Sequence, residues 1–361
     1  MAGGYRRAMT KGIAASVHGR VQAVRAMPTA ADDQASFLPM CLIACAWNAH
    51  PAYPLVLVAN RDEFHARPSA PLAPWDEHPN ILGGRDLEAG GGWLALDRQR
   101  PRLAAVTNVR EPLSPLPRLS RGRLVSDYLS GDESAVSFAE LRRVDGNDYG
   151  PFNLLLWDGE ELVMATNRLK PRWETVSPGI HGLSNGGLDA PWPKTRRLMD
   201  QLQRWLASDA AAAAEPSLDP LFDALADQQR PADAELPDTG IGLERERLLA
   251  PIFIDGGGYG TRCSTVIVTE RMNRHNVTHV FERSFAAAGG VVITREYHPA
   301  YGNVVELDHG NDLVTRYAHA SAVFVRQGDL IKRGQKIAEV GSTGRSTGAH
   351  LHFEVLVQGV P

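Results

Sequence analysis

Residues 40–64 read MCLIACAWNAHPAYPLVLVANRDEF, and this stretch decides the fold of the first part of the chain. Two short apolar runs, at 41–47 and 55–59, are bounded by Pro, His and Asn, which is typical of buried strands joined by a turn. They predict a hairpin at the edge of a core. Four polar residues, Asn-Arg-Asp-Glu at 60–63, follow the second run directly. We expect them to close that strand with some side chains at the edge of the core.

Similar apolar runs recur along the chain, each flanked by Gly, Asp or Asn. They predict strands at 92–96, 103–107, 152–157, 161–166 and 264–269. Between them, apolar residues at helical spacing predict helices at 122–130, 134–143, 193–207 and, more briefly, 218–228. Strands enclosed by helices indicate a layered fold of the α+β class.

From residue 290 onward the pattern changes to short apolar runs separated by Gly-containing turns. These runs predict strands at 290–295, 303–308, 313–317, 336–340 and 351–357. The last part of the chain is therefore predicted to be an all-β module.

Composition narrows the function classes. The formal net charge is −4, which argues against nucleic acid as the main partner. Three cysteines, at 41, 45 and 263, are too few to staple 361 residues, so a reducing, cytoplasmic location is expected. No apolar run approaches the roughly 20 residues that cross a bilayer, so no membrane span is expected.

Residues 1–39 scatter Arg and Lys among Ala, Gly and Ser, without the apolar segment of a secretory signal. They are expected to be a disordered extension or a stretch translated from a start codon placed too early, with the natural start at Met40. An amphipathic targeting arm is the alternative.

Cys41 follows Met40 directly, so the choice of start codon decides whether this cysteine has a free α-amine. If translation begins at Met40, removal of the methionine leaves Cys41 as the first residue. A free α-amine with a pKa of about 8 then lies beside the thiol and can act as the base that activates it, as in N-terminal nucleophile (Ntn) hydrolases. The alternative is that Cys41, set in an apolar run, is a buried small hydrophobic residue.

Several motifs occur in a consistent order between residues 40 and 284. They are Met40-Cys-Leu-Ile, the polar tetrad 60–63 with Phe64 and Arg67-Pro68, Gly90-Gly-Gly-Trp93, Thr107-Asn108, Gly182-Leu-Ser-Asn185, Pro191-Trp192, Gly258-Tyr-Gly-Thr-Arg262 and Phe281-Glu-Arg-Ser284. This set resembles the NRDE family, also called transport and Golgi organisation protein two. The resemblance implies an αββα Ntn-hydrolase-like sandwich over 40–285, similar to the choloylglycine and penicillin-V acylases, which cleave amides with an N-terminal cysteine.

By that resemblance Cys41 is the nucleophile. Arg61 lowers the pKa of its thiol, and Asp62 orients the amine. Asn108 and Asn185 stand like the donors that stabilise the tetrahedral intermediate. The alternative for each asparagine is a turn-capping residue.

Arg262, in a Gly-Tyr-Gly-Thr turn, would be a second cationic support, or otherwise part of a surface salt bridge. The expected partner of this domain is a small molecule: an amide, a thioester, an acyl lipid or haem. No cofactor is expected for it.

The segment His350-Leu-His352-Phe-Glu354 puts two imidazoles at i and i+2 of a predicted strand, so that both point to one face. It follows Gly302-Asn-Val-Val-Glu-Leu-Asp-His-Gly310, Thr315-Arg-Tyr-Ala-His319, Gly328, Lys332-Arg-Gly334 and Gly341-Ser-Thr-Gly-Arg-Ser-Thr-Gly348. Together these motifs resemble the lysostaphin-type (LytM) zinc endopeptidases of peptidoglycan over 286–361. The likeness makes His352 a zinc ligand, with His319 and His350 polarising the scissile carbonyl or stabilising the intermediate.

That family also takes two zinc ligands from an upstream His-x-x-x-Asp pair, which this chain lacks. His275 and His279, at i and i+4, are possible substitutes, but they lie in a polar turn. A catalytic zinc normally has three protein ligands, so the zinc site is expected to be incomplete and the peptidase inactive. The module could still contact peptidoglycan.

Both predicted domains are incomplete at the same point, and no linker separates Phe285 from Ala286. A deletion, frameshift or assembly join explains this, and a genuine fusion with a binding module is the alternative. Three readings of function follow: an Ntn-type cysteine hydrolase, a zinc endopeptidase of the cell wall, or a non-catalytic protein that binds haem or acyl lipid.

Overall fold

The computed structural model describes residues 40–110, 117–213, 216–256, 258–273, 275–285, 290–309, 313–329, 331 and 335–357. The predicted extension at 1–39 and the first residues after the predicted junction, 286–289, lie outside these ranges. The fold is mixed, as predicted, and contains more strand than helix.

The first sheet has five antiparallel strands. Their order is β10 (Gly179–Leu183), β1 (Met40–Trp47), β2 (Leu55–Phe64), β11 (Tyr259–Arg271) and β12 (Asn276–Ser284). The predicted hairpin of β1 and β2 is present, but its place at the edge of the core is wrong. Strands far away in sequence, β10 and β11, pair with its two outer sides and make it the centre of the sheet.

The polar tetrad also lies differently from the prediction. β2 continues through Phe64, so residues 60–63 lie inside the strand, and all four are buried. The start of β11 pairs with this part of β2 and supplies the backbone partners that a strand end would lack.

The second sheet has seven antiparallel strands in chain order. They are β3 (Ser69–Pro74), β4 (Ile81–Asp86), β5 (Leu94–Asp97), β6 (Leu103–Asn108), β7 (Phe152–Trp157), β8 (Leu162–Thr166) and β9 (Arg172–Thr175). Strands β5 to β8 were predicted, whereas β3, β4 and β9 were missed. The edge strands β3 and β9 have at least half of their residues exposed, and β4 contains two glycines and two charged residues.

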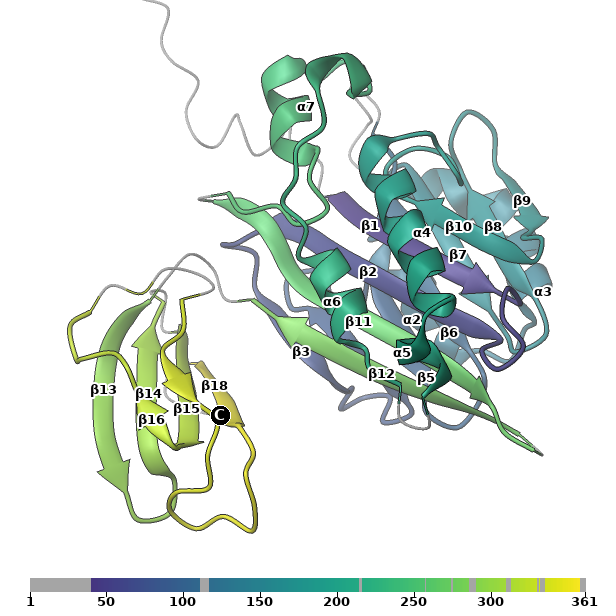
Figure 1. Ribbon diagram of the computed structural model, residues 1–361. Helices are drawn as coiled ribbons and strands as arrows, with labels where there is room; N and C mark the ends of the chain where they lie inside the picture. Colours follow the sequence, from purple (N-terminus) through teal and green to yellow (C-terminus); the bar gives the residue numbers. More distant parts are fainter. Residues whose placement is uncertain are drawn as a thin grey trace, which may run out of the picture. The chain divides into compact units, whose positions relative to one another are not determined.

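The two sheets pack face to face, and helices cover the outer face of each one (Figure 1). Helices α2 (Gly122–Ser130) and α3 (Ala135–Asp145) pack on the seven-stranded sheet. Helices α4 (Pro193–Leu206), α5 (Asp209–Ala212) and α6 (Asp219–Leu225) pack on the five-stranded sheet, and α7 (Leu243–Leu249) follows. Short 3₁₀ turns lie at Gly146–Asp148 and Asp233–Glu235.

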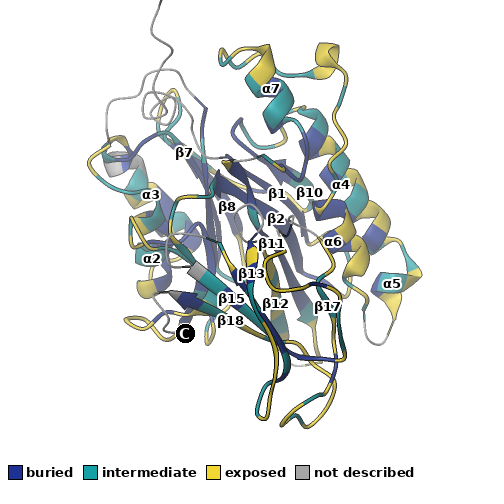
Figure 2. Cartoon of the chain, turned by 90° about the vertical axis from the view of Figure 1, so that its left-hand side faces the viewer, coloured by how far each residue is buried: buried dark blue, intermediate teal, exposed yellow. Residues whose placement is uncertain are grey.

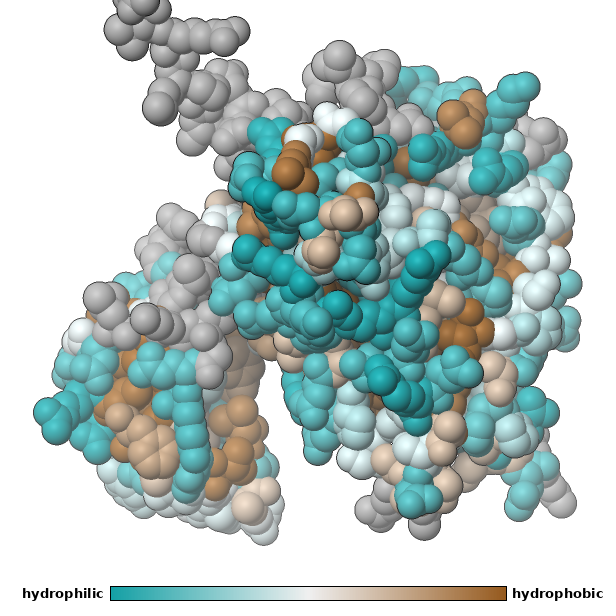
Figure 3. Space-filling model, turned by 45° about the horizontal axis from the view of Figure 1, so that its top comes forward, coloured by the Kyte–Doolittle hydropathy of each residue, from teal (hydrophilic) through white to brown (hydrophobic). Residues whose placement is uncertain are grey.

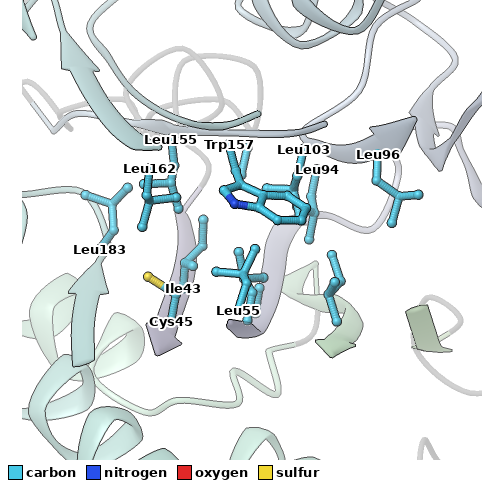
Figure 4. Packing of buried hydrophobic residues seen from close by; sticks show 14 of the residues in the cluster. Ile43, Cys45, Leu55, Leu94, Leu96, Leu103, Leu155, Trp157, Leu162 and Leu183 are labelled. Atoms are coloured by element: carbon cyan, nitrogen blue, oxygen red, sulfur yellow. The ribbon is translucent and has the colours of Figure 1, made fainter. Parts of the chain in front are cut away.

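This layering explains the unbroken apolar run of β1. Ile43 and Cys45 point between the sheets, toward residues such as Leu155 and Trp157 of β7 (Figure 4). Leu42 and the alanines at 44 and 46 point the other way, into the helical layer. Because both faces of the strand are covered, apolar residues occupy every position, and Figure 2 shows the central strands as buried.

The C-terminal module is a separate four-stranded antiparallel sheet. Its strands are β13 (Val291–His298), β14 (Gly302–Asp308), β15 (Leu313–Ala320) and β18 (His352–Val357), beside a two-stranded ribbon of β16 (Ala322–Val323) and β17 (Ala338–Glu339). Its buried core is small and contains Val292, Val305, Leu307, Val325 and Ile331.

Figure 3 shows hydrophobic surface among polar surface on this module, and several of its large apolar side chains are exposed. They are Val291, Tyr297, Phe324, Val340, Leu351 and Phe353. The described part of the module therefore leaves much apolar surface uncovered.

Candidate functional site

Cys41 lies near the start of β1, on the face that points between the sheets, and the residue is 7% exposed. Arg61 of β2 pairs with Cys41 on one side and with Cys263 of β11 on the other. Directly paired residues share one face of a sheet. The guanidinium of Arg61 is therefore flanked by two buried thiols that are more than 200 residues apart in sequence.

The thiol of Cys41 is neutral in this chain. Burial, followed by the charge of Asp62, raises its pKa to about 12. The charge of Arg61 and the backbone N–H of Asp62 lower it, which is the predicted direction for Arg61, but burial outweighs both. A thiol in this state is a poor nucleophile, because the thiolate is the reactive form.

Successive side chains of a strand point to opposite faces, so the four residues of the polar tetrad are divided between the two faces of the sheet. Asn60 points toward the helices, where its Nδ2 donates to the carbonyls of Leu225 at 2.8 Å and Ile252 at 2.9 Å. Its Oδ1 accepts from Ser264 at 2.6 Å. Asn60 thus joins the sheet to the helical layer, and its place in the tetrad is structural.

Asp62 is fully buried on the same helix-facing side as Asn60. Its Oδ1 accepts a hydrogen bond from Thr261 at 2.6 Å, and it pairs with Met40 across the two strands. The carboxylate therefore lies next to the residue that precedes Cys41. This position suits the predicted role of orienting an amine at Cys41.

Arg61 and Glu63, on the other face, belong to a cluster of charges near the thiol. Arg61 Nη2 lies 3.5 Å from Asp86 and 3.8 Å from Glu63. Arg67 lies 2.7 Å from the same Asp86. Burial raises the pKa of the Glu63 carboxyl, while Arg61 and Arg67 lower it.

Arg121 joins this cluster from the helical layer of the other sheet. Burial lowers the pKa of its guanidinium, and electrostatic interactions with Cys41 and Glu63 act against that shift. Sequence reasoning used the segment 120–122 only as the start of a helix and so missed this residue. No local signal could have found it, because Arg121 meets the thiol only when the two sheets pack.

The two predicted asparagines lie close to Cys41. Ser184 donates to the carbonyl of Cys41 at 3.0 Å, and the next residue, Asn185, donates through Nδ2 to the carbonyl of Asn108 at 2.7 Å. Sequence reasoning missed Ser184, although it belongs to the motif at 182–185. The structure brings Cys41, Asn108 and Asn185 together at one end of the sandwich.

Arg262 lies beneath the loop that follows β2. Its Nη1 donates to the carbonyls of Phe64 at 2.9 Å, His65 at 3.1 Å and Arg67 at 3.0 Å. These bonds hold the loop that carries Arg67. Support of the thiol by Arg262 stays a prediction.

Met40 occupies the space beside the backbone nitrogen of Cys41. Its backbone N–H donates to the hydroxyl of Tyr259 at 2.7 Å, and its sulfur accepts from Arg110. The remaining cavity has a volume of about 20 Å³, which is room for about one water molecule. Its lining includes Met40, Arg110, Trp192, Lys194 and Glu246.

Lys194 is a second buried ionisable group at this cavity. Burial lowers the pKa of its ammonium to about 8, while the charge of Asp62 acts in the opposite direction. Its Nζ donates to the carbonyl of Leu249 at 3.1 Å. Sequence reasoning stopped at the motif Pro191-Trp192, two residues short of this lysine.

Three histidines lie together in the C-terminal module. One ring nitrogen from each of His319, His350 and His352 lies within 4.8 Å of those of the other two. His352 opens β18, while His350 forms only an isolated bridge with Gly341, so its predicted place in a strand is wrong. The predicted proximity of the three residues is nevertheless present.

The substitutes considered for the missing zinc ligands do not join this group. His279 lies on β12 of the first sheet, 3.7 Å from Glu270, and His275 lies in the preceding turn. Within the described residues, the three histidines are the only potential metal-binding group. No helix in the part of the chain that the structure describes is long and apolar enough to span a bilayer.

Comparison with known proteins agrees with the motifs. The profile of a family described as Transport and Golgi organisation 2 matches residues 40–287, more than half of the chain. The chain belongs to this family.

Relatives in the Transport and Golgi organisation 2 family match over nearly their whole length. The Transport and Golgi organization protein 2 homolog of Homo sapiens is 33% identical over 250 residues, covering 64% of this chain and 89% of that protein. Transport and Golgi organization protein 2 of Drosophila melanogaster is 26% identical over 257 residues, covering 65% of this chain and 89% of that protein. The range that the family profile matches, residues 40–287, includes Cys41, the polar tetrad and β12.

The Transport and Golgi organisation 2 domain is followed by a domain of peptidase family M23, which matches residues 282–361. Peptidoglycan DD-endopeptidase ShyA of Vibrio cholerae is 42% identical over 98 residues, covering 26% of this chain and 23% of that protein. The chain thus spans about a quarter of the length of that endopeptidase. The catalytic domain of lysostaphin from Staphylococcus simulans is 30% identical, covering 26% of this chain and 68% of that domain, with a TM-score of 0.20.

The two family matches overlap over residues 282–287. This overlap contains the predicted junction between Phe285 and Ala286. Phe285 packs edge-on against Phe253 and donates its backbone N–H to the carbonyl of Arg262, so it contacts the Transport and Golgi organisation 2 domain.

Proposed function

We propose that the first domain is an Ntn-type cysteine hydrolase, active when Cys41 is the first residue, and that it cleaves the amide or thioester bond of a small acyl molecule. The convergence of Cys41, Arg61, Asp62 and Asn185 at one end of β1 carries this proposal. The two-sheet, helix-covered architecture supports an Ntn-hydrolase-like fold. Three free thiols suit a reducing compartment, so we expect the enzyme in the cytoplasm.

The proposed reaction has two stages. The α-amine of Cys41 takes the thiol proton, and the sulfur attacks the substrate carbonyl carbon to form an S–C bond. The C–N or C–S bond of the substrate then breaks, and the leaving amine or thiol takes the proton from the ammonium. Water next attacks the acyl-cysteine, releases a carboxylic acid and restores the thiol.

Each neighbouring polar side chain has a role in this proposed reaction. Asp62 orients the ammonium, and Arg61 stabilises the thiolate. Asn185, with Asn108 behind it, stabilises the oxyanion. Arg262 acts through the loop at 64–67 and is a positioning residue.

The chain that still carries Met40 is expected to be inactive. The nitrogen of Cys41 is in a peptide bond with Met40, so it is not a free amine. The N–H of Met40 is bonded to Tyr259, and the thiol of Cys41 has a pKa of about 12. The cavity beside Met40 is also too small for a substrate. Removal of the residues before Cys41 would supply the base and empty the space that the Met40 side chain now fills.

The other two functions have weaker support. A binding protein for haem or acyl lipid would need a pocket beside Cys41, and the cavity at Met40 holds little more than a water molecule. A peptidoglycan endopeptidase would need the two upstream zinc ligands, which the sequence lacks. For the M23 domain we propose contact with peptidoglycan without cleavage.

The test uses a chain that begins at Cys41, incubated with chromogenic acyl amides and acyl thioesters and followed by intact mass. We expect turnover and a mass increase of one acyl group on Cys41. Cys41→Ala should abolish both, whereas the matched variant Cys45→Ala, on the same strand, should retain them. Turnover that survives Cys41→Ala would contradict the proposal. Intact mass of the protein from its native host would show whether such a chain forms.

A further inference from the structure

The geometry points to a divalent-metal site built by His319, His350 and His352, with an open fourth coordination position. This ligand set differs from the one implied by the resemblance, in which His352 is the only ligand of the three and a His-x-x-x-Asp pair completes the site. It is independent of Cys41 and of the proposed hydrolase.

The hydrogen bonds of the three rings prepare them for coordination. His319 Nδ1 lies 2.7 Å from the carbonyl of Thr343, and His350 Nδ1 lies 2.9 Å from the carbonyl of Gly348. Carbonyl oxygens only accept, so Nδ1 carries the proton in both rings and Nε2 presents its lone pair. The partner of each ring thereby fixes the tautomer, as the outer-shell partners of metal-bound histidines do.

The tautomer of His352 is also fixed by a hydrogen-bond partner, but here the partner contacts Nε2 instead of Nδ1. Its Nε2 lies 2.8 Å from Glu354, whose carboxylate also binds Arg316 and Tyr301. A carboxylate that accepts from Nε2–H leaves Nδ1 as the lone-pair donor. Each ring therefore has one nitrogen that is not directed at a hydrogen-bond acceptor, and three imidazole nitrogens are the donor set that zinc takes together with an open position in some enzymes.

The separation of the three ring nitrogens allows an ion to enter. A tetrahedral zinc with N ligands at about 2.0–2.1 Å places those nitrogens roughly 3.3 Å apart. The ring nitrogens lie within 4.8 Å of one another, so the widest pair must close by at most about 1.5 Å. His350 is exposed and lies outside the strand, which leaves its side chain free to make this movement.

The backbone at His319 gives a further indication of a built site. His319 is buried and adopts a positive φ of 60°, which non-glycine residues rarely do. Its strand bulges here, because two residues of β15, Ala318 and His319, face the single residue Val304 of β14. Strain and bulges of this kind direct side chains at functional sites. With all three imidazoles acting as ligands, His319 and His350 would not serve as general bases, so the site would bind rather than cleave.

The experiment titrates the full, metal-free chain with Zn²⁺ by calorimetry and with Co²⁺ by visible absorption. We expect one equivalent of each ion and the absorption of tetrahedral cobalt. His350→Gln, on an exposed side chain, and His352→Gln should each weaken Zn²⁺ binding by at least roughly ten-fold. The control His279→Gln should bind as the wild type does.

Three results would overturn the inference: no saturable binding at one equivalent, the same affinity in His350→Gln as in the wild type, or a loss of binding in His279→Gln. Far-UV circular dichroism of each variant identifies any that fails to fold. His350→Gln decides the matter if His352→Gln does not fold, because His350 lies outside the sheet.

Discussion

Deleting residues 1–40 so that the chain starts at Cys41 is expected to accelerate alkylation of this cysteine strongly. In the full chain, burial and the charge of Asp62 raise the pKa of its thiol to about 12. At pH 7.5 such a thiol is ionised in roughly one molecule in 30,000, against roughly one in ten for an ordinary cysteine with a pKa of about 8.5. Removing Met40 uncovers the thiol and places an ammonium beside it. A return to the ordinary pKa would raise the rate by about 3,000-fold.

The assay treats both chains with iodoacetamide at pH 7.5 and measures the alkylation of each cysteine by peptide mass spectrometry. Cys45 is the internal control, because burial raises the pKa of its thiol to about 12 as well, and because it lies on the same strand. It should stay slow in both chains, and rapid reaction of Cys45 would reveal unfolding. The reasoning is refuted if Cys41 remains as slow as Cys45 in the shortened chain, or if it reacts rapidly in the full chain.

Two further predictions concern buried polar groups. Burial lowers the pKa of Lys194 to about 8 from its usual 10.5, so between these values the unfolded chain binds more protons than the native one. We therefore expect the difference in unfolding free energy between the wild type and Lys194→Met, measured in urea, to change with pH. The value for the wild type minus that for the variant should rise across this window, and a constant difference would contradict the prediction. Asn60→Ala should reduce the unfolding free energy by about 2–4 kcal/mol, because the carbonyls of Leu225 and Ile252 and the hydroxyl of Ser264 lose their buried partner. A loss no larger than that of a surface substitution, below about 0.5 kcal/mol, would show that this network is not structural.

Elements with a strong local pattern were predictable from the sequence. The strand at 152–157 and the helix at 122–130 have the bounds that their apolar spacing predicted. The edge strand at 172–175 was not predicted, because its residues are mostly exposed and its place depends on pairing with β8. The central position of the first hairpin also escaped prediction, since β10 and β11 come from much later in the chain.

The residues of the candidate sites were likewise predictable from the sequence only in part. Motifs supplied Cys41, Arg61 and the histidines, and the spacing of the histidines in sequence already suggested a shared face. Arg121 had no local signal, because it approaches the thiol from another layer. The separation of Asn60 from Arg61 follows from the period of a strand, but it becomes visible only once β2 is known to continue through the tetrad.

The sequence by itself determined the family, the order of the two domains and the residue types available for chemistry, because each of these is written in short stretches of chain. Only the tertiary structure decided the state of those residues. A pKa depends on everything that packs around the group, and the layers that bury Cys41 come from both sheets and from strands some 200 residues away. For the same reason, the three histidines became a candidate metal site only when β15 and β18 paired and brought His319 beside His352.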